Sequence, residues 1–180
     1  IMASKAKMLR IVTENTMNGI GDAPCGYSDS QLHQLFLSFK SMLISDLDNA
    51  HFADMYAQTI VYGLFAARLN DSTPQNFSRE EAAQLIPKSN PFLRMLFNSI
   101  AGNDLDSRVA WIVDDLVETF AATDVSKVMS QYGHNSKRND PMVHFYEDFL
   151  EQYDAKLRKD FGVWYTPKPV VRFIVRSIDQ

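Results

Sequence analysis

The sequence predicts an all-α protein, a bundle of about seven helices. Apolar residues recur at three- and four-residue spacing in one segment after another, which is the period of a helix face. Residues that start and stop helices bound most of these segments. No segment alternates polar and apolar residues for long enough to predict a strand. These three observations favour a helical bundle over any sheet architecture.

The first half of the chain contains three of the predicted helices. Residues 4–18 form the first, which the Gly- and Pro-containing stretch NGIGDAPCG ends. The second begins after Ser28 or Ser30, because either side chain can cap it. The third, residues 49–70, is apolar nearly all round, which predicts a helix in the core. Gly63 weakens that helix, so we expect a neighbouring element to pack close to it.

Further capped helices follow. Ser78 and Glu81 have the spacing of a capping box, in which each side chain bonds the other residue's backbone N–H. Asn90, Asp124 and Asp140 are the predicted caps of later helices. Four further helices are predicted at residues 90–102, 104–122, 124–133 and 140–154.

Composition limits the function classes. The chain has 180 residues, of which 46% are hydrophobic, so it can bury a core. The net charge of -4, from 18 basic and 22 acidic side chains, gives no overall positive field of the kind that DNA-binding domains show. Cys25 is the only cysteine, which rules out an internal disulfide and fits a reducing, cytoplasmic compartment. No apolar run is long enough to predict a membrane span.

Both ends of the sequence lead us to expect a piece of a longer protein. Ile1 precedes Met2, and the start lacks the apolar region of a signal peptide. The last residues, VRFIVRSIDQ, stop inside a patterned helix without a stop signal.

The stretch GVWYTPKPVVRFIV, residues 162–175, combines a helix start with two aromatic residues. Thr166 is a good N-cap and Pro167 a good first-turn residue. Trp164 and Tyr165 stand just before the cap, where aromatic rings can form a shelf for a flat ligand and free N–H groups can receive a carboxylate. The residues themselves leave two interpretations open, an ordinary helix start or the edge of a cofactor pocket. The apolar face of the helix that follows consists of Val170, Val171, Ile174, Val175 and Ile178.

The same stretch resembles a known motif. Residues 162–171, GVWYTPKPVV, are similar to the G-x-[YF]-[YF]-T-P-x-x-[VL]-[VI] segment at the start of the catalytic domain of amino-group DNA methyltransferases. The lead-in DPMVHFYEDFLEQYDAKLRKDFG and the earlier FADMYAQTIVYGLFAARL resemble the helical region of single-polypeptide type I-like (type ISP) restriction–modification enzymes. The likeness covers about residues 49–178 and is strongest after Asp140.

The resemblance implies a division of the chain and a role for each part. Residues 1–153 would be a helical coupler-like domain. Residues 154–180 would start a truncated α/β methyltransferase domain and contribute its first helix. The parent enzyme would be an adenine-N6 DNA methyltransferase that uses S-adenosylmethionine, preceded by nuclease and ATP-driven motor domains. Its partners would be DNA and these neighbouring domains, with no membrane.

The resemblance also implies cofactor contacts. Trp164 stands where the family usually has Tyr or Phe, which enlarges the aromatic surface and removes a hydroxyl. The family's glycine-rich loop and its [ND]-P-P-[YF] tetrad, which grips the flipped adenine, would follow Gln180. SNPF at residues 89–92 and NDPM at residues 139–142 each lack one proline, so no catalytic residue is assigned and the chain alone is not expected to methylate. The implied S-adenosylmethionine contacts are Gly162, Trp164, Tyr165, Thr166 and Pro167.

Two further groups of charged residues have competing interpretations. The C-terminal basic residues would either contact DNA phosphates in a salt-sensitive way or form a solvated face that balances the acidic EDFLEQYD. His144 and Glu147 share a helix face, but no second pair of ligands accompanies them, so no metal site is expected. The weak candidates for DNA contact are Lys156, Arg158, Lys159 and Lys168.

We therefore expect a non-catalytic coupler that holds a motor region and a methyltransferase in fixed relation. The alternative is a self-contained helical adaptor that binds protein partners. The last helix separates them: the coupler predicts an exposed apolar face whose natural sheet is absent, whereas the adaptor predicts a closed polar surface. A helical DNA-binding module is a third option, which the net charge of -4 disfavours.

Overall fold

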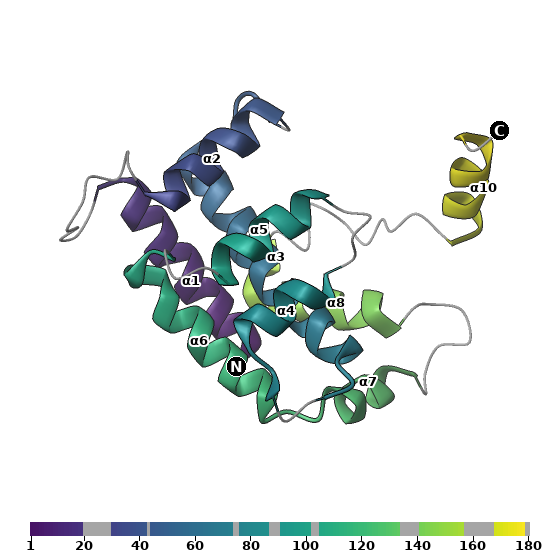
Figure 1. Ribbon diagram of the computed structural model, residues 1–180. Helices are drawn as coiled ribbons and strands as arrows, with labels where there is room; N and C mark the ends of the chain where they lie inside the picture. Colours follow the sequence, from purple (N-terminus) through teal and green to yellow (C-terminus); the bar gives the residue numbers. More distant parts are fainter. Residues whose placement is uncertain are drawn as a thin grey trace.

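The structure is a computed structural model that describes residues 1–19, 30–42, 44–73, 76–86, 91–101, 105–133, 141–156 and 168–178 (Figure 1). These residues contain nine α-helices and no strand. The predicted all-α class is confirmed. Eight of the described helices precede residue 154, in agreement with the bundle of about seven that the sequence predicts.

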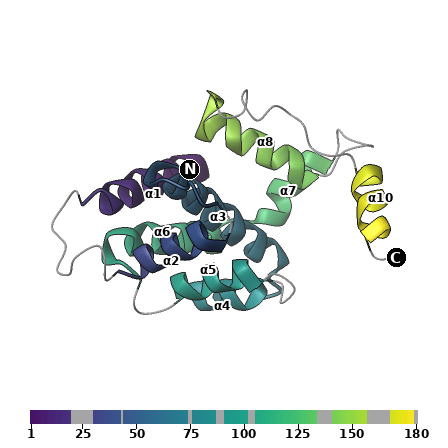
Figure 2. The same cartoon turned by 90° about the horizontal axis from the view of Figure 1, so that it is seen from above.

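Helix α3 (Asn49–Asn70) is the centre of the bundle, as its all-round apolar sequence predicts. Helices α1 (Met2–Met17) and α6 (Ser107–Ala121) run side by side and both pack against it, an arrangement that Figures 1 and 2 show from two directions. This packing buries aromatic and aliphatic side chains on several sides of α3. Its buried apolar residues are Phe52, Ala53, Tyr56, Ala57, Ile60, Val61, Leu64, Phe65 and Ala67.

The remaining helices of the bundle cover the other sides of α3. The rings of Phe36 and Phe39 on α2 (Gln31–Met42) both contact Phe52 edge to face, at centroid distances of 5.4 and 5.3 Å. Helices α4 (Arg79–Leu85) and α5 (Pro91–Ala101) pack on each other, and α4 also contacts α3. Helices α7 (Val125–Gly133) and α8 (Pro141–Tyr153) pack together, and α8 also contacts α1.

Several helices start where the sequence predicts. Ser30 accepts a hydrogen bond from the backbone N–H of His33, and Asp124 accepts one from Lys127. Ser78 caps α4 by accepting from the N–H of Glu81 at 3.2 Å. The predicted capping box is only half formed, because the Glu81 carboxylate accepts from the Thr73 hydroxyl at 2.8 Å instead. The carboxylate thus ties α4 to the preceding loop.

Helix α10 (Lys168–Ile178) lies apart from the bundle in both views (Figures 1 and 2). No helix in the described part of the chain is both long and apolar enough to cross a lipid bilayer.

Candidate functional site

The predicted cofactor contacts fall between the last helix of the bundle and α10. Gly162, Trp164, Tyr165, Thr166 and Pro167 lie outside the described residues, as do two DNA-contact candidates, Arg158 and Lys159. The structure describes the two elements that flank them. Helix α8 and residues 154–156 lead in, and α10 leads out. What the structure shows near the predicted cofactor contacts therefore comes from these two flanking elements.

Helix α10 presents an apolar face to solvent. Its side chains from residue 170 to residue 178 are all exposed. The apolar ones among them expose between 42% and 80% of their surface. Side chains with this spacing form one face of a helix, and such a face gains stability only when another surface covers it. The exposed residues are Val170, Val171, Phe173, Ile174, Val175 and Ile178.

Helix α8 is joined to the bundle by an aromatic seam. The ring of Phe145 stacks on Phe65 of α3 with centroids 4.1 Å apart, and Tyr146 meets Tyr62 edge to face at 4.9 Å. Further along, Phe149 stacks on Tyr153 at 5.5 Å, and both of these side chains are buried. Aromatic pairs in these geometries stabilise packing beyond the area that they bury.

A polar network continues this seam at the C-terminal end of α8. The Tyr153 hydroxyl donates to Asp54 Oδ1 of α3 at 2.6 Å, and Gln58 donates to Asp54 Oδ2 at 2.7 Å. Tyr146 donates to Gln58 Oε1 at 3.1 Å. The guanidinium of Arg10 on α1 lies 3.8 Å from Asp54. Burial, followed by the bond to Asp54, raises the pKa of Tyr153, so its hydroxyl keeps its proton and remains a donor.

The basic candidates for DNA contact are placed only in part. Lys156 is exposed, and its backbone N–H donates to the Asp154 carboxylate at 2.9 Å. Lys168 is the first residue of α10. Arg172 and Arg176 follow it at four-residue spacing and are exposed, so the three residues belong to one side of the helix. Within the described residues, α10 thus carries basic residues at regular four-residue spacing.

His144 and Glu147 meet on α8, as their spacing predicts. The distance from His144 Nδ1 to Glu147 Oε2 is 3.2 Å. Within the described ranges, no three His, Cys, Asp or Glu side chains are grouped so that they could hold a metal ion. The pair is a local contact on one helix.

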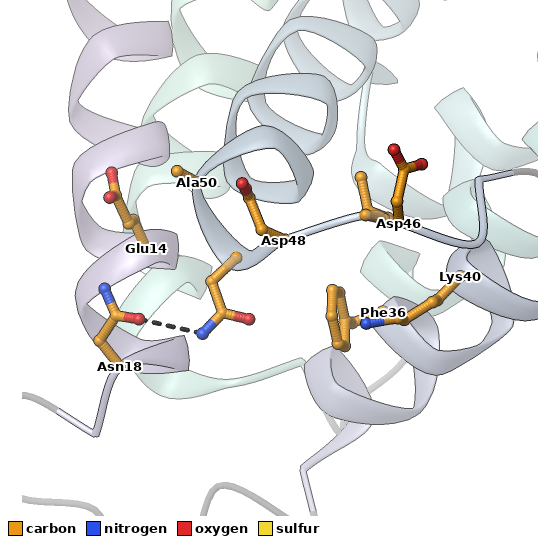
Figure 3. A pocket seen from close by; sticks show the side chains of 9 residues that line it. Glu14, Asn18, Phe36, Lys40, Asp46, Asp48 and Ala50 are labelled. Atoms are coloured by element: carbon orange, nitrogen blue, oxygen red, sulfur yellow. Dashed lines mark hydrogen bonds between the residues drawn. The ribbon is translucent and has the colours of Figure 1, made fainter.

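An open pocket lies at the start of α3 (Figure 3). It has a volume of about 610 Å³ and lies where the end of α1, the helix α2 and the start of α3 meet. Asn49 donates to Asn18 Oδ1 across it at 2.9 Å. The acidic Glu14, Asp46 and Asp48 line it together with Lys40, and none of the residues predicted to bind cofactor or DNA is among them.

The comparisons with known proteins concern the C-terminal part of the chain. Residues 137–180 match the family described as N-6 DNA methylase. The comparisons with curated proteins and with solved structures each found no match. The matched segment includes α8, α10 and all five predicted cofactor contacts. It links this part of the chain to adenine-N6 DNA methyltransferases, a family that generally uses S-adenosylmethionine.

Sequence reasoning missed the polar network. Asp54 is a charged residue inside the core helix α3, and Arg10 lies on the helix that packs against it. A carboxylate without a local partner in a core segment was therefore the available signal. Tyr153 is 99 positions away from Asp54, and no local pattern connects the two residues.

Proposed function

We propose that this chain is the helical coupler of a DNA restriction–modification enzyme, joined to the start of an adenine-N6 methyltransferase domain. The observation that carries the proposal is an overlap: the N-6 DNA methylase match begins at residue 137, and α8, which lies inside the match, is built into the bundle. A methyltransferase segment that starts inside a helical body fits a protein in which that body holds the catalytic domain.

The proposed cofactor is S-adenosylmethionine, held in part by the stretch from Gly162 to Pro167. Trp164 and Tyr165 would supply the aromatic surface, and Thr166 with Pro167 would start the helix at whose N-terminus the methionine carboxylate is received. The rest of the pocket and the catalytic tetrad would come from chain beyond Gln180. The chain by itself would then be non-catalytic.

The exposed face of α10 favours this proposal over a self-contained adaptor. The adaptor predicts a closed polar surface on the last helix, whereas Val171, Ile174 and Val175 each expose more than two fifths of their surface. In an α/β domain, a helix of this kind covers a sheet. We propose that the sheet of the methyltransferase domain covers this face.

The proposed partners are DNA and the neighbouring domains of the same polypeptide. Lys156, Arg158, Lys159 and Lys168 would contact phosphates near the DNA entry, with an affinity that falls as salt rises. A motor and nuclease region would dock on the bundle, and the enzyme would act in the cytoplasm. We thus propose the type ISP architecture, in which the nuclease, motor, coupler and methyltransferase lie in one polypeptide.

Calorimetric titration of S-adenosylmethionine tests it. The titration is made into this chain and into the longer gene product that continues past Gln180. We expect only the longer protein to bind, and we expect Thr166→Ala in that protein to weaken binding. Ser177→Ala, which removes an exposed α10 hydroxyl that donates to the backbone carbonyl of Phe173 in the same helix, is the matched control. A longer protein that binds nothing would leave the helical adaptor as the better account.

A further inference from the structure

Helix α8 lies inside the segment that matches the N-6 DNA methylase family. In the structure, the same helix packs against the bundle. We infer that Arg10, Asp54 and Tyr153 form a clamp that locks the C-terminal end of α8 to α1 and α3, so that α8 opens and moves only together with the bundle. The inference deepens the proposed function, because it names the contact through which the bundle would move the methyltransferase segment. The clamp itself can be tested on the chain alone.

The carboxylate of Asp54 is the centre of the clamp. It accepts from the Tyr153 hydroxyl at 2.6 Å through one oxygen and from Gln58 at 2.7 Å through the other. The first bond joins α8 to α3, and the second fixes the orientation of the carboxylate within α3. Hydrogen bonds to a charged acceptor are about twice as strong as neutral ones, and a satisfied polar network in a packed region fixes one arrangement.

Arg10 adds the third helix. Its Nη1 lies 3.8 Å from Asp54 and 3.9 Å from Asp154, and its guanidinium stands over the Tyr153 ring at 5.7 Å. At these distances Arg10 acts as a positive charge between two carboxylates and an aromatic face, rather than as a two-pronged hydrogen-bond donor. It therefore draws α1 to the same point at which α8 meets α3.

The clamp lies at the point where the chain continues from α8 toward the predicted cofactor motif, so it fixes the start of that segment. Asp154 directly follows α8, and its backbone N–H donates to the carbonyl of Leu150 at 2.8 Å, which continues the helical turn. Tyr153 is only 2% exposed. The last residues of α8 are thus fixed from three sides at the place where the chain leaves the bundle toward the cofactor motif. A shift of α1 or α3 would therefore also move the C-terminal end of α8.

Hydrogen exchange on the full chain, followed by mass spectrometry of peptides, tests the clamp. In the unchanged protein we expect α8 to open with the same free energy as α3, as one cooperative unit. Tyr153→Phe should raise the opening of the α8 amides about tenfold and leave those of α6 unchanged, since it removes one bond to a charged acceptor. Asp54→Asn should act similarly, and the double variant should open little more than either single one.

Two variants control for general destabilisation. Tyr132→Phe removes a comparable bond from α7 to Asp148 of α8, at 3.0 Å on an exposed surface, and should leave the end of α8 unchanged. Arg10→Lys keeps the positive charge and should exchange like the unchanged protein, whereas Arg10→Met should raise α8 opening. The clamp is wrong if α8 already exchanges far faster than α3, or if Tyr153→Phe and Tyr132→Phe behave alike. Neither outcome depends on S-adenosylmethionine binding, so the two proposals can fail separately.

Discussion

At the residue scale, the least expected side chain is a buried arginine. Arg68 lies in the core helix α3 with only 7% of its surface exposed. Its Nε donates to the carbonyl of Phe120 at 3.0 Å, and its Nη2 donates to that of Thr123 at 3.3 Å. Phe120 lies in the last turn of α6, where its carbonyl also accepts from the backbone N–H of Thr123, and Thr123 follows the end of the helix. A cation at a helix C-terminus also interacts favourably with the helix dipole. Arg68 thus caps a helix that lies far away in sequence.

Replacing this residue tests the cap. Arg68→Met keeps much of the apolar stem, which lies near the Phe77 ring, but it removes a donor from each of the two carbonyls and the ion-pair partner of Asp71. We expect the free energy of unfolding to fall by about 3 kcal/mol, the usual cost of breaking a buried charged network. Urea denaturation followed by circular dichroism measures it. Lys127→Met, at an exposed position on α7, should change stability by less than about 0.5 kcal/mol.

Gly63 shows why a residue that weakens a helix is present in the core. A Cβ atom at this position would overlap the ring of Phe97, which is fully buried on α5. The close neighbour that the sequence predicts is therefore confirmed, and the structure identifies it as Phe97. Gly63→Ala gains about 1 kcal/mol of helix propensity but overpacks this contact.

We expect Gly63→Ala to destabilise the protein by about 1–2 kcal/mol in net terms. The double variant Gly63→Ala with Phe97→Leu tests the cause, because the smaller side chain makes room for the new methyl group. In denaturant unfolding, the two changes together should cost less than the sum of the separate costs. If the costs of the two substitutions simply add, the contact with the Phe97 ring is not the reason for glycine at position 63.

At the element scale, the start of α3 is held by an exposed ion pair. Asp48 accepts from the backbone N–H of His51 at 2.8 Å, and His51 Nδ1 lies 2.9 Å from the same carboxylate. The backbone hydrogen bond from His51 lowers the pKa of Asp48, and the side-chain hydrogen bond to Asp48 raises the pKa of His51. Both shifts favour the charged pair.

The two shifts define the pH range in which this helix start is most stable. The contribution of Asp48 is present above its ordinary pKa of 3.8 and is lost as the pH falls through its lowered value. The contribution of His51 is complete below its ordinary pKa of 6.5 and is lost as the pH rises through its raised value. The pair is therefore strongest between these two ordinary values, as a small local effect at an exposed site.

An NMR titration of His51 checks this prediction. In the unchanged protein the pKa of His51 should lie above 6.5. In Asp48→Asn it should move back toward 6.5, because the carboxylate that stabilises the imidazolium is gone. A pKa of His51 that does not respond to Asp48→Asn would contradict the assigned cause.

At the scale of the whole molecule, the structure separates a packed bundle from an exposed final helix. Helix α8 contributes buried Phe149, Leu150 and Tyr153 to the core, while the described side chains of α10 from residue 170 onward are all exposed. Burial of apolar surface is the main source of folding stability. Stability should therefore depend on α8 and not on α10.

Two truncations test this division, and with it the proposed domain boundary near residue 154. A chain that ends at Lys156 should unfold in urea with a free energy within about 0.5 kcal/mol of the full chain. A chain that ends at residue 136 loses three buried side chains, each contributing about 1.5–3 kcal/mol, and should be largely unfolded or aggregated. A marked loss of stability on ending at Lys156 would place the boundary later in the chain.

The parts of the fold and site that sequence reasoning predicted are those with a local cause. The capping roles of Ser30, Ser78 and Asp124 depend on an N–H group three residues away, so each is visible in a short window. The central position of α3 follows from its composition, because a helix that is apolar all round must be covered all round. The resemblance to DNA methyltransferases was readable for the same reason, since the residues that carry it are consecutive, and they lie inside the segment that matches the N-6 DNA methylase family.

The sequence by itself determined that the described chain folds as helices, that α3 lies in the core, that a neighbour packs against Gly63, and that residues 137–180 match the N-6 DNA methylase family. Only the tertiary structure decided which helix faces which. Arg68 finds its carbonyl partner 52 positions away, and Tyr153 finds Asp54 across 99. Helical periodicity shows which side chains share a face, but it carries no information about the element that the face will meet. That choice is made when the whole chain buries its apolar surface at once, and it made α8 part of the bundle and left α10 exposed.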